Sequence, residues 1–188
     1  MIATQLETVR SICERHGRDA GRLMDIAREV QSACGCVDPD AVTLIAEEVN
    51  APRVEVESLV TFYSFFSEEP KGKVVIRLSN DIIDRMAGFE HVKQVFCEEL
   101  GVGLGETSED GLITLEETAC IGMCDQAPAA LVNDVVVTEL SSDKARQIVK
   151  ALRQHGDPSR LVRAFGDGNN AHPLVRSMVA NNLRKPGE

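Results

Sequence analysis

The sequence contains no long hydrophobic run. A helix that crosses a bilayer needs about 20 consecutive, mostly apolar residues, and charged residues interrupt every apolar stretch of this chain well before that length. The sequence therefore predicts no transmembrane helix. We expect any membrane association to come through a partner protein.

Basic residues are also in short supply. The 188 residues include 20 Lys and Arg but 30 Asp and Glu, which gives a formal net charge of -10. Proteins that bind nucleic acid neutralise phosphate groups with basic patches. The acidic balance therefore argues against a nucleic-acid-binding function.

The usual residues of catalysis are sparse. The four histidines lie at positions 16, 91, 155 and 172, and none has a serine, cysteine or carboxylate at a spacing typical of a catalytic triad. The glycines of residues 101–105 do not fit the G-x-G-x-x-G dinucleotide motif, and they follow a predicted helix where that motif requires a strand. We expect no catalysis by this chain alone.

Six cysteines are present, yet a disulfide framework is not expected. They are Cys13, Cys34, Cys36, Cys97, Cys120 and Cys124. A chain of this length can bury a sufficient core without disulfides, and its first residues, Met-Ile-Ala-Thr-Gln-Leu-Glu, lack the pattern of a secretory signal. We therefore expect reduced thiols and a cytoplasmic location.

Residues 1–72 have the pattern of a small helical bundle. Apolar residues recur at helical spacing from Leu23 to Val30, which places them on one helix face. Asp38 followed by Pro39 is typical of a helix start. Further helices are predicted up to Tyr63, so we expect an N-terminal helical domain over residues 1–72.

The pattern changes after Gly72. The run 73–78 is rich in β-branched residues and predicts a strand. The expected elements after it are a helix over 89–100, a strand over 112–115, a hairpin of 129–132 and 135–137, and a helix that follows Ser141. This order and size predict a thioredoxin-like α/β domain over residues 73–153, and the whole chain is expected to be an α+β protein.

Residues 154–188 differ from the rest in charge. They carry five basic and three acidic residues, whereas residues 1–153 carry 15 basic and 27 acidic. Apolar residues at helical spacing run from Leu174 to Leu183. A basic, partly apolar extension on an acidic protein suits docking onto another subunit, and the alternative is a frayed terminus.

A closely spaced cysteine pair lies between the strand predicted over 112–115 and the one predicted over 129–132. Cys120 and Cys124 lie in the run Thr118-Ala-Cys-Ile-Gly-Met-Cys-Asp-Gln-Ala-Pro128. This spacing differs from the C-x-x-C of thioredoxin-type oxidoreductases. A disulfide within the loop and a zinc site with Asp84 are alternatives to a larger metal centre.

The run 105–128 resembles the thioredoxin-like [2Fe-2S] ferredoxin subunit of respiratory complex I and its relatives in NAD-linked hydrogenases and formate dehydrogenases. The segment Val60-Thr-Phe-Tyr-Ser-Phe-Phe66, followed by Lys71 and Gly72, is similar to the helical N-terminal region of the same family. The resemblance covers about residues 18–152.

The resemblance implies a [2Fe-2S] site held by four cysteines, two of them just after the first strand of the α/β domain. Cys120 and Cys124 match the late pair, but Ser79 and Asp84 stand at the positions of the early pair. Hydroxyl and carboxylate oxygens are harder donors than thiolates. The cluster is therefore expected either to have mixed ligation or to be lost.

The resemblance further implies an accessory electron-transfer or structural subunit of a multisubunit NAD(P)H-linked oxidoreductase. A flavoprotein subunit that binds FMN and the nicotinamide is the expected partner, together with further iron-sulfur subunits, so FMN and NAD(P) are not expected on this chain. Two alternatives remain, namely a structural or regulatory subunit without a redox centre and a stand-alone thiol oxidoreductase.

Overall fold

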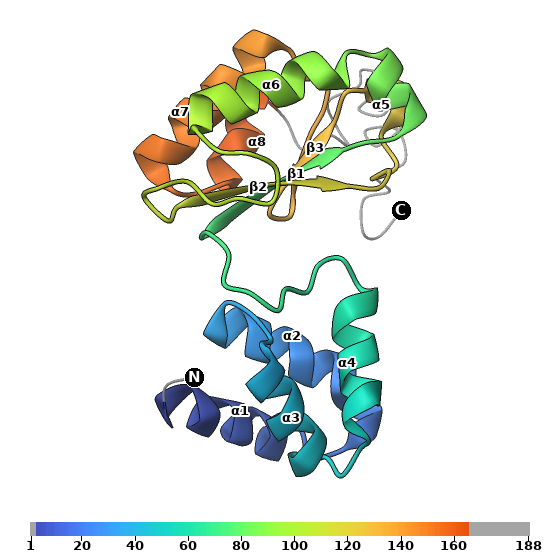
Figure 1. Ribbon diagram of the computed structural model, residues 1–188. Coiled ribbons are helices and arrows are strands. Elements are labelled where there is room, and N and C mark those ends of the chain that lie inside the picture. The colour runs from blue at the N-terminus through green and yellow to red at the C-terminus, as the bar shows by residue number, and fades with distance from the viewer. Residues whose placement is uncertain (1–2, 166–188) are drawn as a thin grey trace, which may run out of the picture. The chain divides into compact units, whose positions relative to one another are not determined.

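The computed structural model describes residues 3–165 and divides the chain into two compact units, one ending at Lys71 and one beginning at Gly72 (Figure 1). Each unit has its own buried core. The apolar helix expected over residues 174–183 lies outside the described residues. Within the described range, no helix is both long and apolar enough to cross a membrane.

The first unit is a bundle of four α-helices and one short 3-10 turn. They are α1 (Ala3–Arg15), η1 (Ala20–Arg22), α2 (Leu23–Cys34), α3 (Pro39–Glu48) and α4 (Arg53–Phe62). The Asp38 carboxylate accepts a hydrogen bond from the Ala41 N–H at 2.8 Å and so caps α3, as the Asp-Pro pattern predicts. Gly35 ends α2 in the left-handed conformation.

The second unit combines a sheet with helices. Its elements are β1 (Val74–Ser79), α5 (Ile82–Met86), α6 (Phe89–Leu100), β2 (Ile113–Thr118), η2 (Cys124–Gln126), β3 (Ala130–Val132), β4 (Val135–Val137), α7 (Ser142–His155) and α8 (Ser159–Phe165). The strand order is β2-β1-β3-β4. Strand β1 pairs in parallel with β2 and antiparallel with β3, and β3 pairs antiparallel with β4.

The core of the second unit lies between this sheet and its helices. Figure 1 shows α6 and α7 along the sheet, and the two helices contact each other. Phe89 and Phe96 of α6 are fully buried, as are Ile148 and Leu152 of α7. These features confirm the predicted thioredoxin-like α+β fold.

Two helices were not predicted from the sequence. The short helix α5 follows β1 directly, although the apolar pattern predicted a helix only from Phe89 onward. Helix α8 lies within the expected C-terminal extension, and its Leu161 is buried in the core of the second unit. Helix α5 is too short to show a helical apolar period, so capping alone marks it.

The start of the sheet requires glycine at position 72. A Cβ atom there would lie 2.7 Å from the Leu112 carbonyl oxygen and 2.9 Å from the Ile113 nitrogen, both backbone atoms. We expect Gly72→Ala to lower the free energy of unfolding of the second unit by about 1–3 kcal/mol. Loss of hydrogen-exchange protection in β1 during urea denaturation measures the effect.

Gly103→Ala is the matched control. The three atoms nearest to its added Cβ all belong to the flexible Glu106 side chain, the first at 3.3 Å. An equal loss of stability in both variants would show that backbone crowding at position 72 is not the cause.

Candidate functional site

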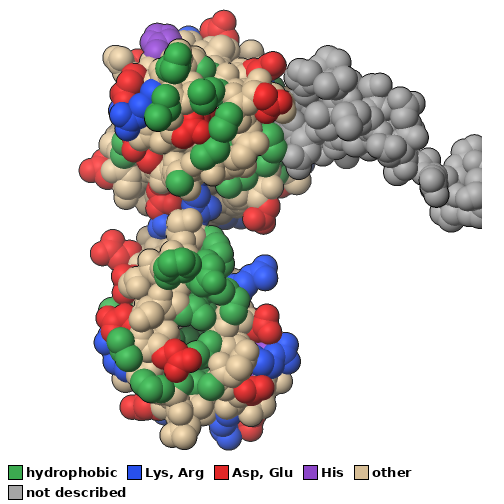
Figure 2. Space-filling model, turned by 90° about the vertical axis from the view of Figure 1, so that its right-hand side faces the viewer, with side chains coloured by type: hydrophobic (Ala, Val, Ile, Leu, Met, Phe, Trp, Pro, Cys, Tyr) green, Lys and Arg blue, Asp and Glu red, His purple; other side chains and the backbone are tan. Residues whose placement is uncertain are grey.

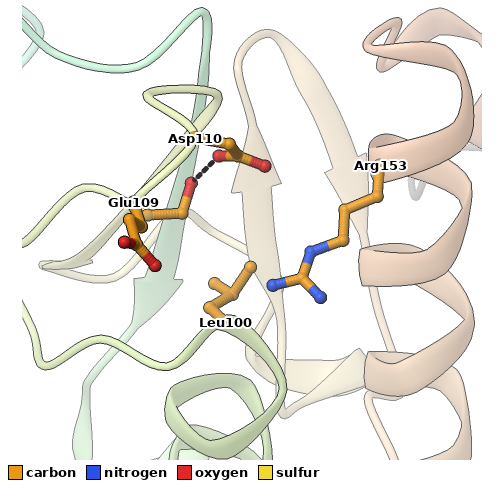
Figure 3. Close-up of a pocket in the computed structure, with 5 residues that line it drawn as sticks. Leu100, Glu109, Asp110 and Arg153 are labelled. Carbon is orange, nitrogen blue, oxygen red and sulfur yellow. Dashed lines mark hydrogen bonds between the residues drawn. The ribbon is translucent and has the colours of Figure 1, made fainter.

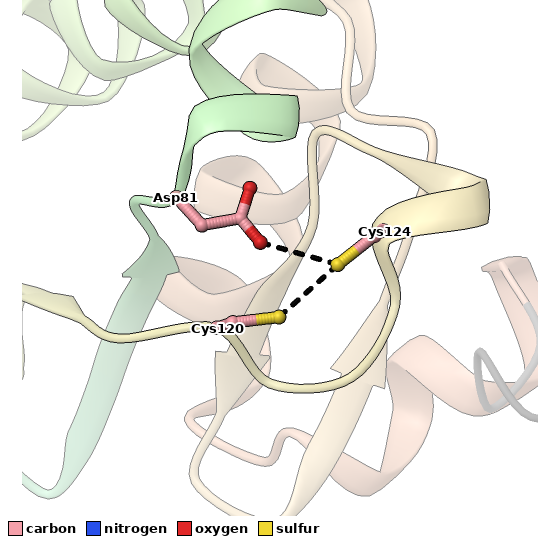
Figure 4. Close-up of side chains that lie close together, drawn as sticks. All are labelled: Asp81, Cys120 and Cys124. Carbon is pink, nitrogen blue, oxygen red and sulfur yellow. Dashed lines mark hydrogen bonds between the residues drawn. The ribbon is translucent and has the colours of Figure 1, made fainter.

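Cys120 and Cys124 lie at the carboxyl edge of the parallel strand pair. Ser79 at the end of β1 is paired with Thr118 at the end of β2, so the residues just after both strands meet at one edge. Cys120 follows β2 by two residues, and Cys124 begins η2. Gly122 takes a positive φ of 83° between them, which lets the loop turn back so that the two sulfurs are 3.1 Å apart (Figure 4).

Asp81 completes this group from the other strand. It follows β1 by two residues and caps α5, where its Oδ1 accepts a hydrogen bond from the Asp84 N–H at 2.9 Å. Its Oδ2 accepts a hydrogen bond from the Cys124 thiol at 3.1 Å. One ligand atom from each of Asp81, Cys120 and Cys124 lies within 4.8 Å of the others, as Figure 4 shows.

Ser79 and Asp84, which the family resemblance predicts to stand at the positions of two cysteines, bind each other. The Ser79 hydroxyl donates to Asp84 Oδ2 at 2.7 Å, and the Ala129 N–H donates to Asp84 Oδ1 at 3.1 Å. Both side chains belong to residues that are only 2% exposed. The polar atoms of both side chains therefore already form hydrogen bonds with other protein atoms.

The hydrogen bonds of the site shift two pKa values. The pKa of the Cys124 thiol is raised to about 12, first by its hydrogen bond with Cys120 and then by its hydrogen bond to the Asp81 carboxylate. The pKa of Asp81 is held below its usual value, first by the Asp84 N–H and then by the two thiols. Asp81 is therefore a carboxylate and Cys124 a neutral thiol in the free protein.

The described residues do not fit a four-thiolate cluster. A [2Fe-2S] cluster in this fold is held by four thiolates, and among the described residues of the second unit only Cys120 and Cys124 have sulfurs that lie close together. In the same unit, Cys97 packs against the apolar core. The oxygens of Ser79 and Asp84 would have to break a buried hydrogen bond before they could bind iron.

Sequence reasoning missed Asp81. Its pattern was visible, because Asp81 and Asp84 are spaced as in a capping box and the structure shows both reciprocal hydrogen bonds. The sequence pattern did not reveal that the same cap turns the second carboxylate oxygen of Asp81 toward Cys124. Asp81 thus lies nearest the thiols, whereas the zinc alternative had named Asp84.

A separate surface pocket in the second unit contains side chains that stabilise a turn. It is lined by Leu100, Ser108, Glu109, Asp110 and Arg153 (Figure 3). The Ser108 hydroxyl donates to Asp110, which lowers the pKa of that carboxyl. Asp110 also accepts from the Leu112 N–H, so its role is to close the turn before β2.

Removing the Ser79 hydroxyl tests the buried hydrogen bond. Ser79→Ala leaves the Asp84 carboxylate without its closest donor, so we expect the free energy of unfolding to fall by about 1–3 kcal/mol. Ser142→Ala is the matched control, because it removes an exposed hydrogen bond with His91. Equal urea midpoints for Ser79→Ala and the native chain would contradict the expectation.

Comparison with known proteins gives one consistent result. The family described as thioredoxin-like [2Fe-2S] ferredoxin matches residues 9–153. The NAD-reducing hydrogenase HoxS subunit alpha of Cupriavidus necator is 33% identical over 95% of this chain, which spans only 30% of that protein. An NADH-quinone oxidoreductase subunit of Pseudomonas aeruginosa is 34% identical over 65% of this chain and 74% of its own length.

A solved structure shares the fold. The NAD+-reducing [NiFe]-hydrogenase in the air-oxidized state superposes with a TM-score of 0.67 at 22% identity, over 79% of this chain and 25% of that chain. This likeness supports the fold alone. Together with the extent of the family match, the relatives show that the chain belongs to the thioredoxin-like [2Fe-2S] ferredoxin family.

Proposed function

We propose that the chain is a subunit of a multisubunit NAD(P)H-linked oxidoreductase that has lost the [2Fe-2S] cluster of its family. In this proposal it supports the assembly instead of carrying an electron. The single observation behind it is the buried hydrogen bond between Ser79 and Asp84. The names of the relatives, an NAD-reducing hydrogenase and an NADH-quinone oxidoreductase, support the type of complex.

The chemistry of the donors favours loss over mixed ligation. Iron-sulfur clusters prefer soft thiolates, while serine and aspartate offer hard oxygens. Ligation by Ser79 and Asp84 would also break the buried hydrogen bond between these two side chains, and a buried polar group that loses its partner costs about 1–3 kcal/mol. The native hydrogen bonds therefore compete with a cluster at both positions.

The partner is proposed to be a flavoprotein subunit that binds FMN and NAD(P), accompanied by further iron-sulfur subunits in the cytoplasm. Exposed apolar side chains support a docking role. On α5, next to the thiol pair, Ile82 is 76% exposed and Met86 is 80% exposed. Residues four apart share a helix face, and clustered exposed apolar residues mark interaction sites.

A second apolar group lies on the helical unit. Phe62 is 79% exposed, and Tyr63 and Phe65 are also partly or largely exposed. Their rings contact one another in sequence, with Phe62 and Tyr63 centroids 5.0 Å apart. In the view of Figure 2, hydrophobic side chains form patches on the surface of each unit. Aromatic side chains are enriched in protein interfaces.

Restoring the missing thiolates tests the loss of the cluster. After anaerobic reconstitution with iron and sulfide, we expect the native chain to retain essentially no iron. The double variant Ser79→Cys/Asp84→Cys should hold about two iron ions per chain, because it has four thiolates at the site. Iron and sulfide analysis and electron paramagnetic resonance after reduction are the measurements.

The single variant Ser79→Cys is the control. It supplies only three thiolates and keeps Asp84 bound to the Ala129 N–H, so it should not match the double variant. A native chain with two iron ions and a reduced [2Fe-2S] spectrum would refute the proposal and favour mixed ligation.

Charging the exposed face of α5 tests the docking role. We expect Ile82→Asp/Met86→Asp to weaken capture of the flavoprotein subunit by about tenfold or more, because each buried apolar side chain contributes about 1.5–3 kcal/mol. Co-purification of the tagged chain with the complex, followed by mass spectrometry of the captured subunits, measures this. Leu104→Asp, at another exposed apolar residue, is the control, and equal capture by both variants would exclude α5 from the interface.

A further inference from the structure

We propose that Asp81, Cys120 and Cys124 form a mononuclear site for a borderline divalent cation of the zinc type, with a fourth position open to water or a partner ligand. This inference rests on the proposed function in one respect, because a [2Fe-2S] cluster would occupy the same two cysteines. Its ligand set differs from that of the family, since Asp81 stands at neither cysteine position of the pattern.

The distances suit one small cation. The two sulfurs are 3.1 Å apart, and Cys124 Sγ is 3.1 Å from Asp81 Oδ2. In tetrahedral zinc sites the ligands lie about 2.0–2.3 Å from the metal, so neighbouring ligand atoms are roughly 3.3–3.8 Å apart. A modest outward movement of three surface side chains therefore suffices to admit the ion.

The structure already orients the carboxylate. Asp81 Oδ1 is occupied by the Asp84 N–H, which leaves Oδ2 directed at the thiols. Asp84 is in turn held by Ser79 and by the Ala129 N–H. Hydrogen bonds behind a ligand fix its direction and raise metal affinity. Ser79 and Asp84 would thus position a replacement ligand, without binding the metal themselves.

Hydrogen bonds at the two sulfurs also favour binding of a cation. The Gly122 N–H points at Cys120 Sγ, with a separation of 3.3 Å, and such a donor stabilises a thiolate. The Cys124 thiol now donates its proton to Asp81 Oδ2 in a hydrogen bond, so a cation would replace that proton between the same two atoms. Two thiols and one carboxylate bind the ion as three anions and release two protons.

The fourth coordination position is open because the three ligand residues are at least partly exposed to solvent. Cys120 is exposed, and Asp81 and Cys124 are only partly buried. Zinc sites that keep a position for water or another ligand have three protein ligands, whereas closed structural sites use four. The exposed Ile82 and Met86 belong to α5, which begins directly after Asp81, so a docked partner would lie within reach of the fourth position.

Cobalt(II) is the probe for this site, because it adopts zinc geometry and reports its ligands spectroscopically. The full-length chain, reduced and with its free thiols counted, is titrated anaerobically with cobalt(II). We expect one ion per chain, with thiolate-to-cobalt charge-transfer bands in the near ultraviolet and tetrahedral bands in the visible. Added zinc should abolish these bands by displacing the cobalt.

Variants decide which residues bind. Cys120→Ser and Cys124→Ser should each lower the charge-transfer intensity by about half or more, because each removes one of the two thiolate ligands. Asp81→Asn should weaken binding by about tenfold or more without unfolding α5, because Asn is as good a helix N-cap as Asp. Unchanged binding by Asp81→Asn would overturn the three-ligand site.

The other closely spaced pair provides the matched control. Cys34 and Cys36 lie in the helical unit, and the double variant Cys34→Ser/Cys36→Ser should bind cobalt as the native chain does. Loss of the bands in that variant would overturn the proposal by placing the ion there.

Iron analysis separates this inference from the proposed function. Iron and acid-labile sulfide in the native chain, at about two ions of each per chain, would refute both. An iron-free chain that gives no thiolate-to-cobalt bands would refute only the mononuclear site. An iron-free chain with bands that depend on Asp81, Cys120 and Cys124 would support both.

Discussion

The arrangement of Asp81, Cys120 and Cys124 depends on one interaction, the buried hydrogen bond between Ser79 and Asp84. It ties the end of β1 to α5, and through the Ala129 N–H it also ties α5 to the residue before β3. Each of the two polar side chains thereby gains a partner away from water, which a buried polar group requires. If, as predicted, these positions correspond to two cysteines of the family pattern, a hydrogen bond here connects segments that a cluster would join in a four-cysteine relative.

The surface next to this hydrogen bond carries two thiols and a carboxylate. Two thiols remain 3.1 Å apart, and the carboxylate of Asp81 lies beside them because it caps the helix that Asp84 anchors. Soft sulfur and one oxygen suit a single borderline cation better than a binuclear iron cluster. The same edge carries the exposed apolar face of α5, so the proposed docking surface lies beside the two thiols.

Several features were predictable because they depend on local pattern. The Asp38-Pro39 helix start, the β-branched strand from Val74 and the turn at 133–134 all appear as expected. The resemblance to complex I-type ferredoxins is confirmed by the family match. The assignment of Ser79 and Asp84 to the lost cysteine positions stays a prediction. Helix α5 was missed, since one and a half turns give no apolar period.

The sequence by itself determined that two cysteines would lie close together, because residues four apart around Gly122 are joined by a short loop. Through the family resemblance it also predicted that two cysteines of a ferredoxin site are replaced, by Ser79 and Asp84. Only the tertiary structure decided that Asp81 joins the pair. Asp81 and Cys120 are far apart along the chain, and they meet because β1 and β2 run parallel with Ser79 opposite Thr118. Strand register is set by the burial of whole sheet faces, so no local pattern near either residue specifies it.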